Sequence, residues 1–229
     1  MRILALETSA KAVSAAVTED GKVLCSGYQD TGLTHSRTLM PIVEAMLKNT
    51  GLTCDAVAVA AGPGSFTGIR IGVSAAKGLA FAADKPCAAV STLEAMARNV
   101  AHMDALVVCA MDARRSQIYN ALFTSEHGRL TRRTPDRTIG LAELAEELRS
   151  EPLPLVIVGD GAVLCEKALT EAGLPCRLAP PQLVMQNAMS VALCAEDLAR
   201  AGKLVSAQEL LPVYLRPPQA QRLRQPPQI

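Results

Sequence analysis

The sequence has few aromatic residues and no tryptophan. Aromatic side chains make up 3% of the 229 residues, which argues against a stacking platform for single-stranded nucleic acid. The formal net charge is only +1, so no global basic excess marks a partner of RNA or of membranes. Apolar residues account for 49% of the chain. The sequence therefore predicts a substantial core built of aliphatic side chains and methionine.

Motifs for metal binding and nucleophilic catalysis are also missing. The three histidines, His35, His102 and His127, form no HxxH, HExxH or HxxxH pair, so no helix presents two imidazoles to a metal, which argues against a metallopeptidase. No GxSxG elbow surrounds Ser65. The seven cysteines form no CxxC pair, which favours reduced, buried thiols. We expect no bound metal and no catalytic residue.

The sequence offers no membrane segment. Met1–Glu7 becomes acidic too soon for a signal peptide, and no apolar run is long enough to span a bilayer. We expect a cytoplasmic protein.

Strands and helices alternate in two sets. We expect two α/β lobes, 1–104 and 105–217, followed by a flexible basic Pro-rich tail, 218–229. The expected strands are 3–6, 13–17, 22–28, 56–61, 87–90, 105–111, 118–123 and 155–158, and the expected helices are 34–50, 65–83, 91–102, 141–149, 161–172 and 188–201. The segment Arg129–Arg137 is expected to be a basic loop.

The stretch 61–72 (AGPGSFTGIRIG) is the most distinctive feature of the chain. Its Gly and Pro residues predict a tight turn between a buried strand and a helix that Ser65 or Thr67 can cap. Such turns can hold phosphate through backbone N–H groups, or they can simply shape the chain. The candidate phosphate turns contain Glu7, Thr8, Ser9, Gly62, Gly64, Ser65, Asp112 and Gly159. None of them matches GxxxxGK[ST] or GxGxxG.

The same helix carries small residues every four positions, at Gly68, Gly72, Ala76 and Ala80. This spacing predicts a smooth face that either packs on the sheet or admits a partner helix, and the pattern alone leaves both open. The preceding helix has an apolar stripe from Leu39 to Leu47, although Pro41 lies inside it.

Several segments together resemble the bacterial TsaB (YeaZ) family, whose members are named as glycoprotease-like or peptidase M22 homologues. The matching segments are Ile3–Ser9, His35–Pro41, Gly62–Gly72, Ser91–Met96, Met111–Arg114, Gly159–Gly161 and Pro212–Arg216. The resemblance implies a two-lobe α/β fold of the actin, hexokinase and Hsp70 type, which is ribonuclease H-like, with mixed sheets flanked by helices.

The resemblance also implies a non-catalytic subunit in the synthesis of N6-threonylcarbamoyladenosine (t6A) at position 37 of tRNAs that read ANN codons. Such proteins pair with the related catalytic subunit TsaD and with the ATPase TsaE, and they form homodimers when alone. A contact with tRNA would involve the basic segment Arg129–Arg137 or the tail. The alternative is a free-standing ATP-dependent phosphotransferase of the same fold.

Family members bind their partner through the first two helices, which map onto His35–Asn49 and Thr67–Ala83. The expected interface residues are Leu39, Ile42, Val43, Met46, Leu47, Gly68, Ile69, Gly72, Val73 and Ala76. One departure concerns the first strand, which usually ends in Asp-Thr and here ends in Glu7-Thr8. The longer side chain displaces the carboxylate, so we expect no cofactor beyond weak or vestigial nucleotide binding.

Overall fold

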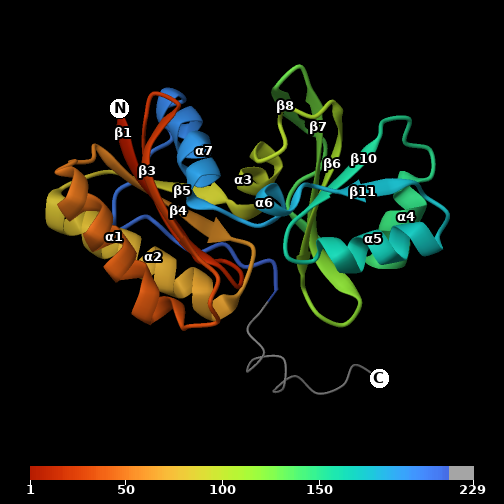
Figure 1. Ribbon diagram of the computed structural model, residues 1–229, viewed down its shortest axis with the longest axis horizontal. Coiled ribbons are helices and arrows are strands. Elements are labelled where there is room, and N and C mark those ends of the chain that lie inside the picture. Colours follow the sequence, from red (N-terminus) through yellow and green to blue (C-terminus); the bar gives the residue numbers. More distant parts are fainter. Residues whose placement is uncertain (217–229) are drawn as a thin grey trace.

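The computed structural model describes residues 1–216 and divides into two lobes (Figure 1). The sheet of the first lobe contains β1 (Arg2–Glu7), β2 (Val13–Glu19), β3 (Lys22–Gln29), β4 (Ala56–Gly62) and β5 (Cys87–Ser91). Its order is β3-β2-β1-β4-β5. The strands β1, β2 and β3 pair antiparallel, whereas β4 and β5 continue parallel to β1. The expected mixed sheet is confirmed.

Both faces of this sheet are covered by helices. The helices α1 (His35–Thr50) and α2 (Phe66–Ala83) cover one face, and α7 (Ala188–Arg200) covers the other (Figure 1). Because successive strand residues point to opposite faces, Leu4 and Leu6 of β1 pack beneath α1 and α2, while Ile3 and Ala5 pack beneath α7. The sequence of β1 is therefore apolar at consecutive positions, as expected for a strand buried on both faces.

The return of the chain to the first lobe corrects the expected domain boundary. Residues of α7 pack with β1, β2, β4 and β5. Beyond α7, Val205 forms an antiparallel bridge with Cys87 of β5, and Leu210 is fully buried in the same lobe. Residues 188–210 therefore belong to the first lobe and not to the second. The hydrophobic pattern of the sequence could not predict this position of α7, because the apolar face of a helix does not indicate which sheet it packs against.

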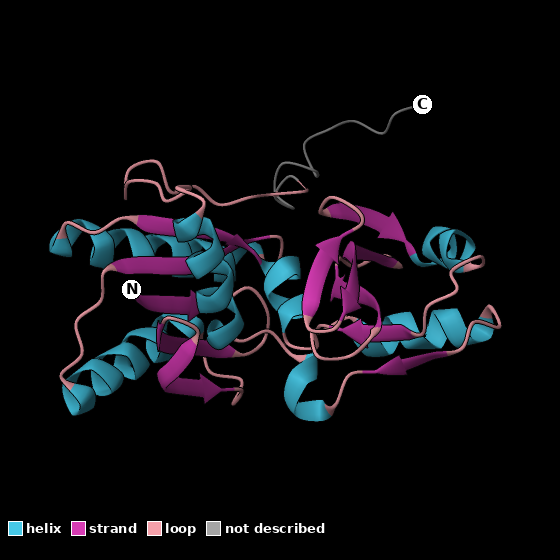
Figure 2. Ribbon diagram, turned by 90° about the horizontal axis from the view of Figure 1, so that it is seen from above, coloured by secondary structure: helices cyan, strands magenta, loops and turns pink. Residues whose placement is uncertain are grey.

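The second lobe repeats the strand order of the first. Its sheet runs β11 (Cys176–Leu178), β10 (Leu155–Val158), β6 (Ala105–Asp112), β7 (Gln117–Glu126) and β8 (Arg129–Arg132), and β9 (Arg137–Gly140) also pairs with β7. The helices α4 (Leu141–Leu148) and α5 (Ala162–Glu171) pack on it, and helices flank the strands in both lobes (Figure 2). The sequence-based interpretation missed the short β11.

The expectation of a basic loop at Arg129–Arg137 is wrong. Most of this segment forms β8 and the start of β9. Its arginines meet acids of the chain: Arg132 pairs with Glu94 and Asp136, Arg133 with Glu151, and Arg137 with Glu147. These pairs reduce the positive charge that the segment offers to RNA. The expected basic tail, 218–229, lies outside the described residues.

Two short helices lie between the sheets, α3 (Thr92–Arg98) and α6 (Pro181–Val184) (Figure 1). The Ser91 hydroxyl caps α3 by accepting from the Glu94 N–H at 3.2 Å, which confirms the expected cap. The helix ends at Arg98, earlier than expected. Leu93 and Met96 pack against β6 and β7, so α3 joins the two lobes. No helix within residues 1–216 combines the length and apolarity needed to cross a membrane.

Candidate functional site: the cleft between the lobes and the outer helices

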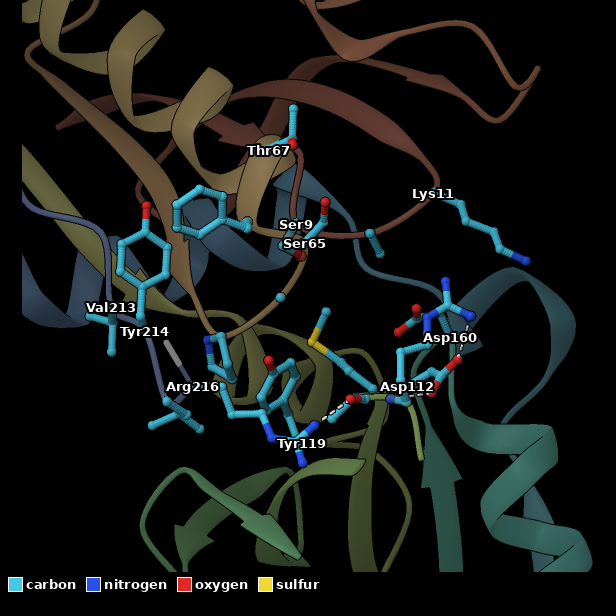
Figure 3. A pocket seen from close by; sticks show the side chains of 18 residues that line it. Ser9, Lys11, Ser65, Thr67, Asp112, Tyr119, Asp160, Val213, Tyr214 and Arg216 are labelled. Atoms are coloured by element: carbon cyan, nitrogen blue, oxygen red, sulfur yellow. Dashed lines mark hydrogen bonds and ion pairs between the residues drawn. The ribbon is translucent and has the colours of Figure 1, made fainter. Parts of the chain in front are cut away.

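A cavity of about 510 Å³ opens where the strand ends of the two lobes meet (Figure 3). The first lobe contributes the turn Ser9–Lys11 and the start of α2, including Ser65 and Thr67. The second lobe contributes Asp112, Tyr119 and Asp160, and the C-terminal segment 213–216 forms a further wall. The structure therefore brings most of the candidate phosphate turns to one site.

Glu7 is the last residue of β1, and its side chain is fully buried. Its Oε1 accepts a hydrogen bond from the Ser9 N–H at 2.5 Å, while Oε2 has no partner among the described residues. Burial raises the pKa of this carboxyl to about 7, and the Asp160 carboxylate across the cleft adds to the rise. A buried carboxyl with one bare oxygen is poorly solvated, and it titrates near neutral pH.

The glycine turn after β4 is packed tightly against the turn after β1. The Ser65 N–H donates to the Ser9 carbonyl at 2.7 Å. A side chain at Gly64 would place its Cβ 2.5 Å from the same carbonyl, and Gly64 has a φ of 157°. The Ser65 hydroxyl accepts from the Gly68 N–H at 3.3 Å, which confirms the predicted cap of α2. Several groups that could cradle a phosphate are thus committed to contacts within the chain.

The carboxylates of the second lobe are also engaged locally. Asp112 accepts from the Arg114 N–H at 2.7 Å and pairs with the Arg114 guanidinium at 3.2 Å. Asp160 accepts from the Gln186 amide at 3.1 Å. Burial raises the pKa of Asp160, in spite of this hydrogen bond. Within residues 1–216, no three His, Cys, Asp or Glu side chains are grouped closely enough to hold a metal ion. The carboxylates that line the cleft, Asp112 and Asp160, are thus both bonded to other residues of the chain.

The C-terminal segment 212–216 contacts both lobes, and the sequence interpretation missed this role. The Val213 N–H donates to the Ala61 carbonyl at 2.7 Å, and a Cβ on Gly62 would lie 2.2 Å from the Val213 carbonyl. Farther along, the Arg216 guanidinium donates to the Ala113 carbonyl at 2.5 Å. The family-like run Pro212–Arg216 was the available signal for this role.

Most of the expected interface residues lie inside the first lobe, which corrects the expectation that they face a partner. The buried ones are Leu39, Val43, Met46, Gly68, Ile69, Gly72, Val73 and Ala76, and Ile42 and Leu47 are half-buried. A Cβ on Gly68 would lie 2.0 Å from the Thr8 carbonyl, and one on Gly72 would lie 2.3 Å from the Thr8 hydroxyl. The small residues therefore allow α2 to approach its own sheet.

The opposite sides of α1 and α2 face outward (Figure 1). We define this outer face as Met40, Pro41 and Glu44 of α1 together with Ile71, Ser74, Ala75 and Gly78 of α2. Met40 is 41% exposed, and a Cβ on Gly78 would meet nothing within 4 Å. The outward side of α2 is thus also made largely of small residues. This exposed side of α2, and not the buried side, is therefore available to a partner helix.

The cysteines conform to their expected structural role. Cys87, Cys109, Cys165 and Cys194 are buried, and all seven thiols are free. Burial raises the pKa of Cys165 and Cys194 to about 12. Such thiols remain protonated and unreactive at neutral pH.

Comparison with known proteins agrees with this architecture. The family model for TsaD, tRNA N6-adenosine threonylcarbamoyltransferase, matches residues 29–209. The tRNA threonylcarbamoyladenosine biosynthesis protein TsaB of Bacillus subtilis is 34% identical over 75% of this chain and 76% of its own. TsaB of Escherichia coli is 31% identical over 94% of this chain and 95% of its own.

Solved structures agree as well. YeaZ from Pseudomonas aeruginosa superposes with a TM-score of 0.80 at 28% identity, covering 93% of this chain and 99% of that chain. The ethanolamine utilization protein EutJ from Carboxydothermus hydrogenoformans shares the fold at a TM-score of 0.51 and 13% identity, covering 84% of this chain and 89% of that chain. The predicted two-lobe fold of the actin and hexokinase type is confirmed, and the chain belongs to the TsaB (YeaZ) family.

Proposed function

We propose that this chain is a non-catalytic subunit in the synthesis of t6A, acting in the cytoplasm with a TsaD subunit and the ATPase TsaE. The modified base is adenosine 37 of tRNAs that read ANN codons. The family supports the pathway, because the matched relatives are named for tRNA threonylcarbamoyladenosine biosynthesis. The observation that carries the role as a binding subunit is the outer face of α1 and α2.

The outer face has the properties of a helix-docking surface. Ser74 and Gly78 are exposed and small, and Ile71 and Ala75 are half-buried beside them. Small side chains let a second helix approach closely, and the apolar Met40 offers area to bury. Each Å² of apolar surface removed from water contributes about 25 cal/mol before the costs of association. In the absence of TsaD, the same face closes on a second copy of the chain.

The cleft supports the non-catalytic part of the proposal. Glu7 is buried and hydrogen-bonded to its own turn, and Asp112 is paired with Arg114. Glu7 is enclosed by the protein, Asp112 is engaged by an arginine, and Tyr214 and Arg216 line the space beside Asp112. Isothermal calorimetry with Mg-ATP tests the alternative phosphotransferase. We expect no binding in the micromolar range, and binding accompanied by turnover would contradict the proposal.

The decisive experiment places an arginine on the outer face. Ser74→Arg and Gly78→Arg add a charged side chain at exposed positions, so the fold should persist while docking is blocked. Val163→Arg is the matched control, because Val163 is 68% exposed on α5 of the other lobe. We expect the first two variants to lose co-elution with TsaD in size-exclusion chromatography and to lose t6A formation with TsaD and TsaE. Unchanged co-elution of both would contradict this docking surface.

A further inference from the structure

Arg70, at the first turns of α2, is held in place by two aromatic rings. Its guanidinium carbon lies 3.9 Å from the centre of the Phe66 ring and 6.0 Å from that of Tyr214. Its Nε donates a hydrogen bond to the Tyr214 hydroxyl at 3.0 Å. The two rings contact each other, with centroids 4.9 Å apart. Arg70 therefore has a defined position, although it is an exposed side chain.

The aromatic platform is itself fixed to the fold. Phe66 is the first residue of α2, and Tyr214 follows Val213, whose N–H bonds to the end of β4. Arg216 anchors the other side of Tyr214 by its bond to Ala113. Ordering a long arginine side chain on binding usually costs conformational entropy. In this chain the contacts with Phe66 and Tyr214 order Arg70 before a partner binds, so this cost is smaller.

Arg70 nevertheless lacks an acidic partner within residues 1–216. Other ordered arginines of the chain meet carboxylates, as Arg137 meets Glu147 at 2.7 Å and Arg132 meets Asp136 at 2.6 Å. For Arg70, only Nε is engaged by a described residue, and the two terminal nitrogens have no hydrogen-bond or ion-pair partner there. A planar guanidinium with two free donor groups suits the two oxygens of a carboxylate.

We propose that Arg70 is a preorganised anchor for a carboxylate side chain of the TsaD subunit. This inference rests on the proposed function, because Arg70 lies one helical turn before Ser74 and so extends the outer face toward the C-terminal segment. Arginine and tyrosine held in fixed positions are typical of the residues that dominate protein interfaces. The Phe66–Arg70–Tyr214 cluster would then form the charged end of an otherwise apolar docking surface.

A carboxylate fits this position better than the backbone of an RNA. Recognition of nucleic acid uses several cations along a phosphate chain. On the same side of α2, the Lys77 ammonium is already bound to the carbonyls of Gln208 and Leu210, each at 3.2 Å. The helix α2 carries only these two cations, and a single guanidinium with two unengaged nitrogens matches a single acidic side chain.

The test measures the affinity of the full chain for TsaD by calorimetry at about 0.1 M and about 0.5 M salt. Arg70→Ala should weaken binding by about tenfold to a hundredfold, and Arg70→Lys should restore part of it, since a carboxylate also accepts from an ammonium. The loss should shrink at the higher salt. Arg129→Ala is the control, because Arg129 is exposed on β8 of the other lobe and should bind as the parent does.

A mutant cycle identifies the carboxylate. Each Asp and Glu on the TsaD docking surface is replaced by Ala and combined with Arg70→Ala. One of these TsaD changes should weaken binding to the parent chain but leave the affinity for Arg70→Ala nearly unchanged. If Arg70→Ala binds TsaD within about twofold of the parent, or if no TsaD acid couples to it, the inference is overturned.

The remaining arms separate this inference from the proposed function. Failure of the unmodified chain to bind TsaD would remove both. Loss of binding in Gly78→Arg with full binding in Arg70→Ala would remove only the anchor. If Arg70→Ala binds TsaD normally but binds a single-stranded RNA oligonucleotide more weakly, the anion is a phosphate and the inference is also overturned. A purely structural role would lower the unfolding midpoint of Arg70→Ala in parallel with its affinity, without coupling to any TsaD acid.

Discussion

The two lobes share one sheet topology but use it differently. In both, the first strand lies between an antiparallel and a parallel neighbour: β1 pairs antiparallel with β2 and parallel with β4, and β6 pairs antiparallel with β7 and parallel with β10. In both, the first strand ends in an acid, Glu7 or Asp112, and the parallel neighbour ends in a glycine (Gly62 of β4) or is followed by one (Gly159 after β10). The cleft is therefore built from two equivalent sets of strand ends.

The equivalent residues have different environments. Glu7 is fully buried with one bare oxygen, whereas the Asp112 side chain is 31% exposed and paired with Arg114. The helices differ as well: α1 and α2 have 16 and 18 residues, while α4 and α5 have 8 and 10. The first lobe thus combines long outer helices with an occluded acid. This asymmetry is consistent with the proposed use of the first lobe for docking.

The largest effect should come from changing how closely α2 approaches its sheet. Gly68→Ala places a methyl group 2.0 Å from the Thr8 carbonyl, an immobile backbone atom. We expect the free energy of unfolding to fall by about 3 kcal/mol or more. Gly78→Ala in the same helix meets open space and should raise it by about 0.5–1 kcal/mol. Urea denaturation measures both.

The contrast with the second lobe makes this prediction specific. Its helix α5 follows the equivalent strand and packs through Cys165 and Leu169, with no glycine along its length. If Gly68→Ala and Gly78→Ala changed the free energy of unfolding equally, α2 would not approach the turn after β1 as closely as the structure shows.

The buried face of α2 also shows what the sequence could and could not reveal. The spacing of Gly68, Gly72 and Ala76 correctly predicted a smooth helical face, but not whether a partner or the chain's own sheet covers it. That depends on the Thr8 carbonyl and hydroxyl, which no helical pattern contains. Strands and caps were predictable, because they depend on local periodicity and on side chains such as Ser65.

Contacts between distant segments were the part that local patterns could not supply. The position of α7 on the first sheet depends on residues 174 positions apart, such as Ser14, whose hydroxyl accepts from the Ala188 N–H at 2.9 Å. The Arg70–Tyr214 pair, 144 positions apart, was missed for the same reason. The basic character of Arg129–Arg137 was visible, but the acids that neutralise it lie partly on other elements.

The free energy of unfolding should depend on pH through the buried Glu7 carboxyl. The folded state holds the proton of Glu7 up to about pH 7, whereas the unfolded chain releases it near its ordinary pKa of 4.5. The free energy of unfolding should therefore fall as pH rises between these values, by about 3 kcal/mol in total. Glu7→Gln has no such proton, so the difference between its unfolding free energy and that of the parent should change by this amount from about pH 4 to about pH 8.

Asp112→Asn is the matched amide replacement at the equivalent strand end of the second lobe, where the side chain is partly exposed and bound to Arg114. Asp160 faces Glu7 across the cleft, and burial raises its pKa too. Some slope should therefore remain in Glu7→Gln. Parallel curves for the parent and Glu7→Gln would show that Glu7 is not occluded.

The smallest effect should come from the ion pairs that join the lobes beside α3. Arg132 donates to Glu94 at 2.8 Å and to Asp136 at 2.6 Å, and its guanidinium lies 4.6 Å from the Phe123 ring centre. The pairs are partly exposed, so Arg132→Ala should lower the free energy of unfolding by only about 1–2 kcal/mol. Arg133→Ala, which removes a longer contact of 3.7 Å to Glu151, should cost less than about 0.5 kcal/mol. A double-mutant cycle that combines each arginine change with Glu94→Ala isolates the ion pair between the lobes. Coupling of Glu94 to Arg132 but not to Arg133 would show that this pair links α3 to the second sheet. If the two arginine changes had equal effects, they would act only through the net charge of the surface.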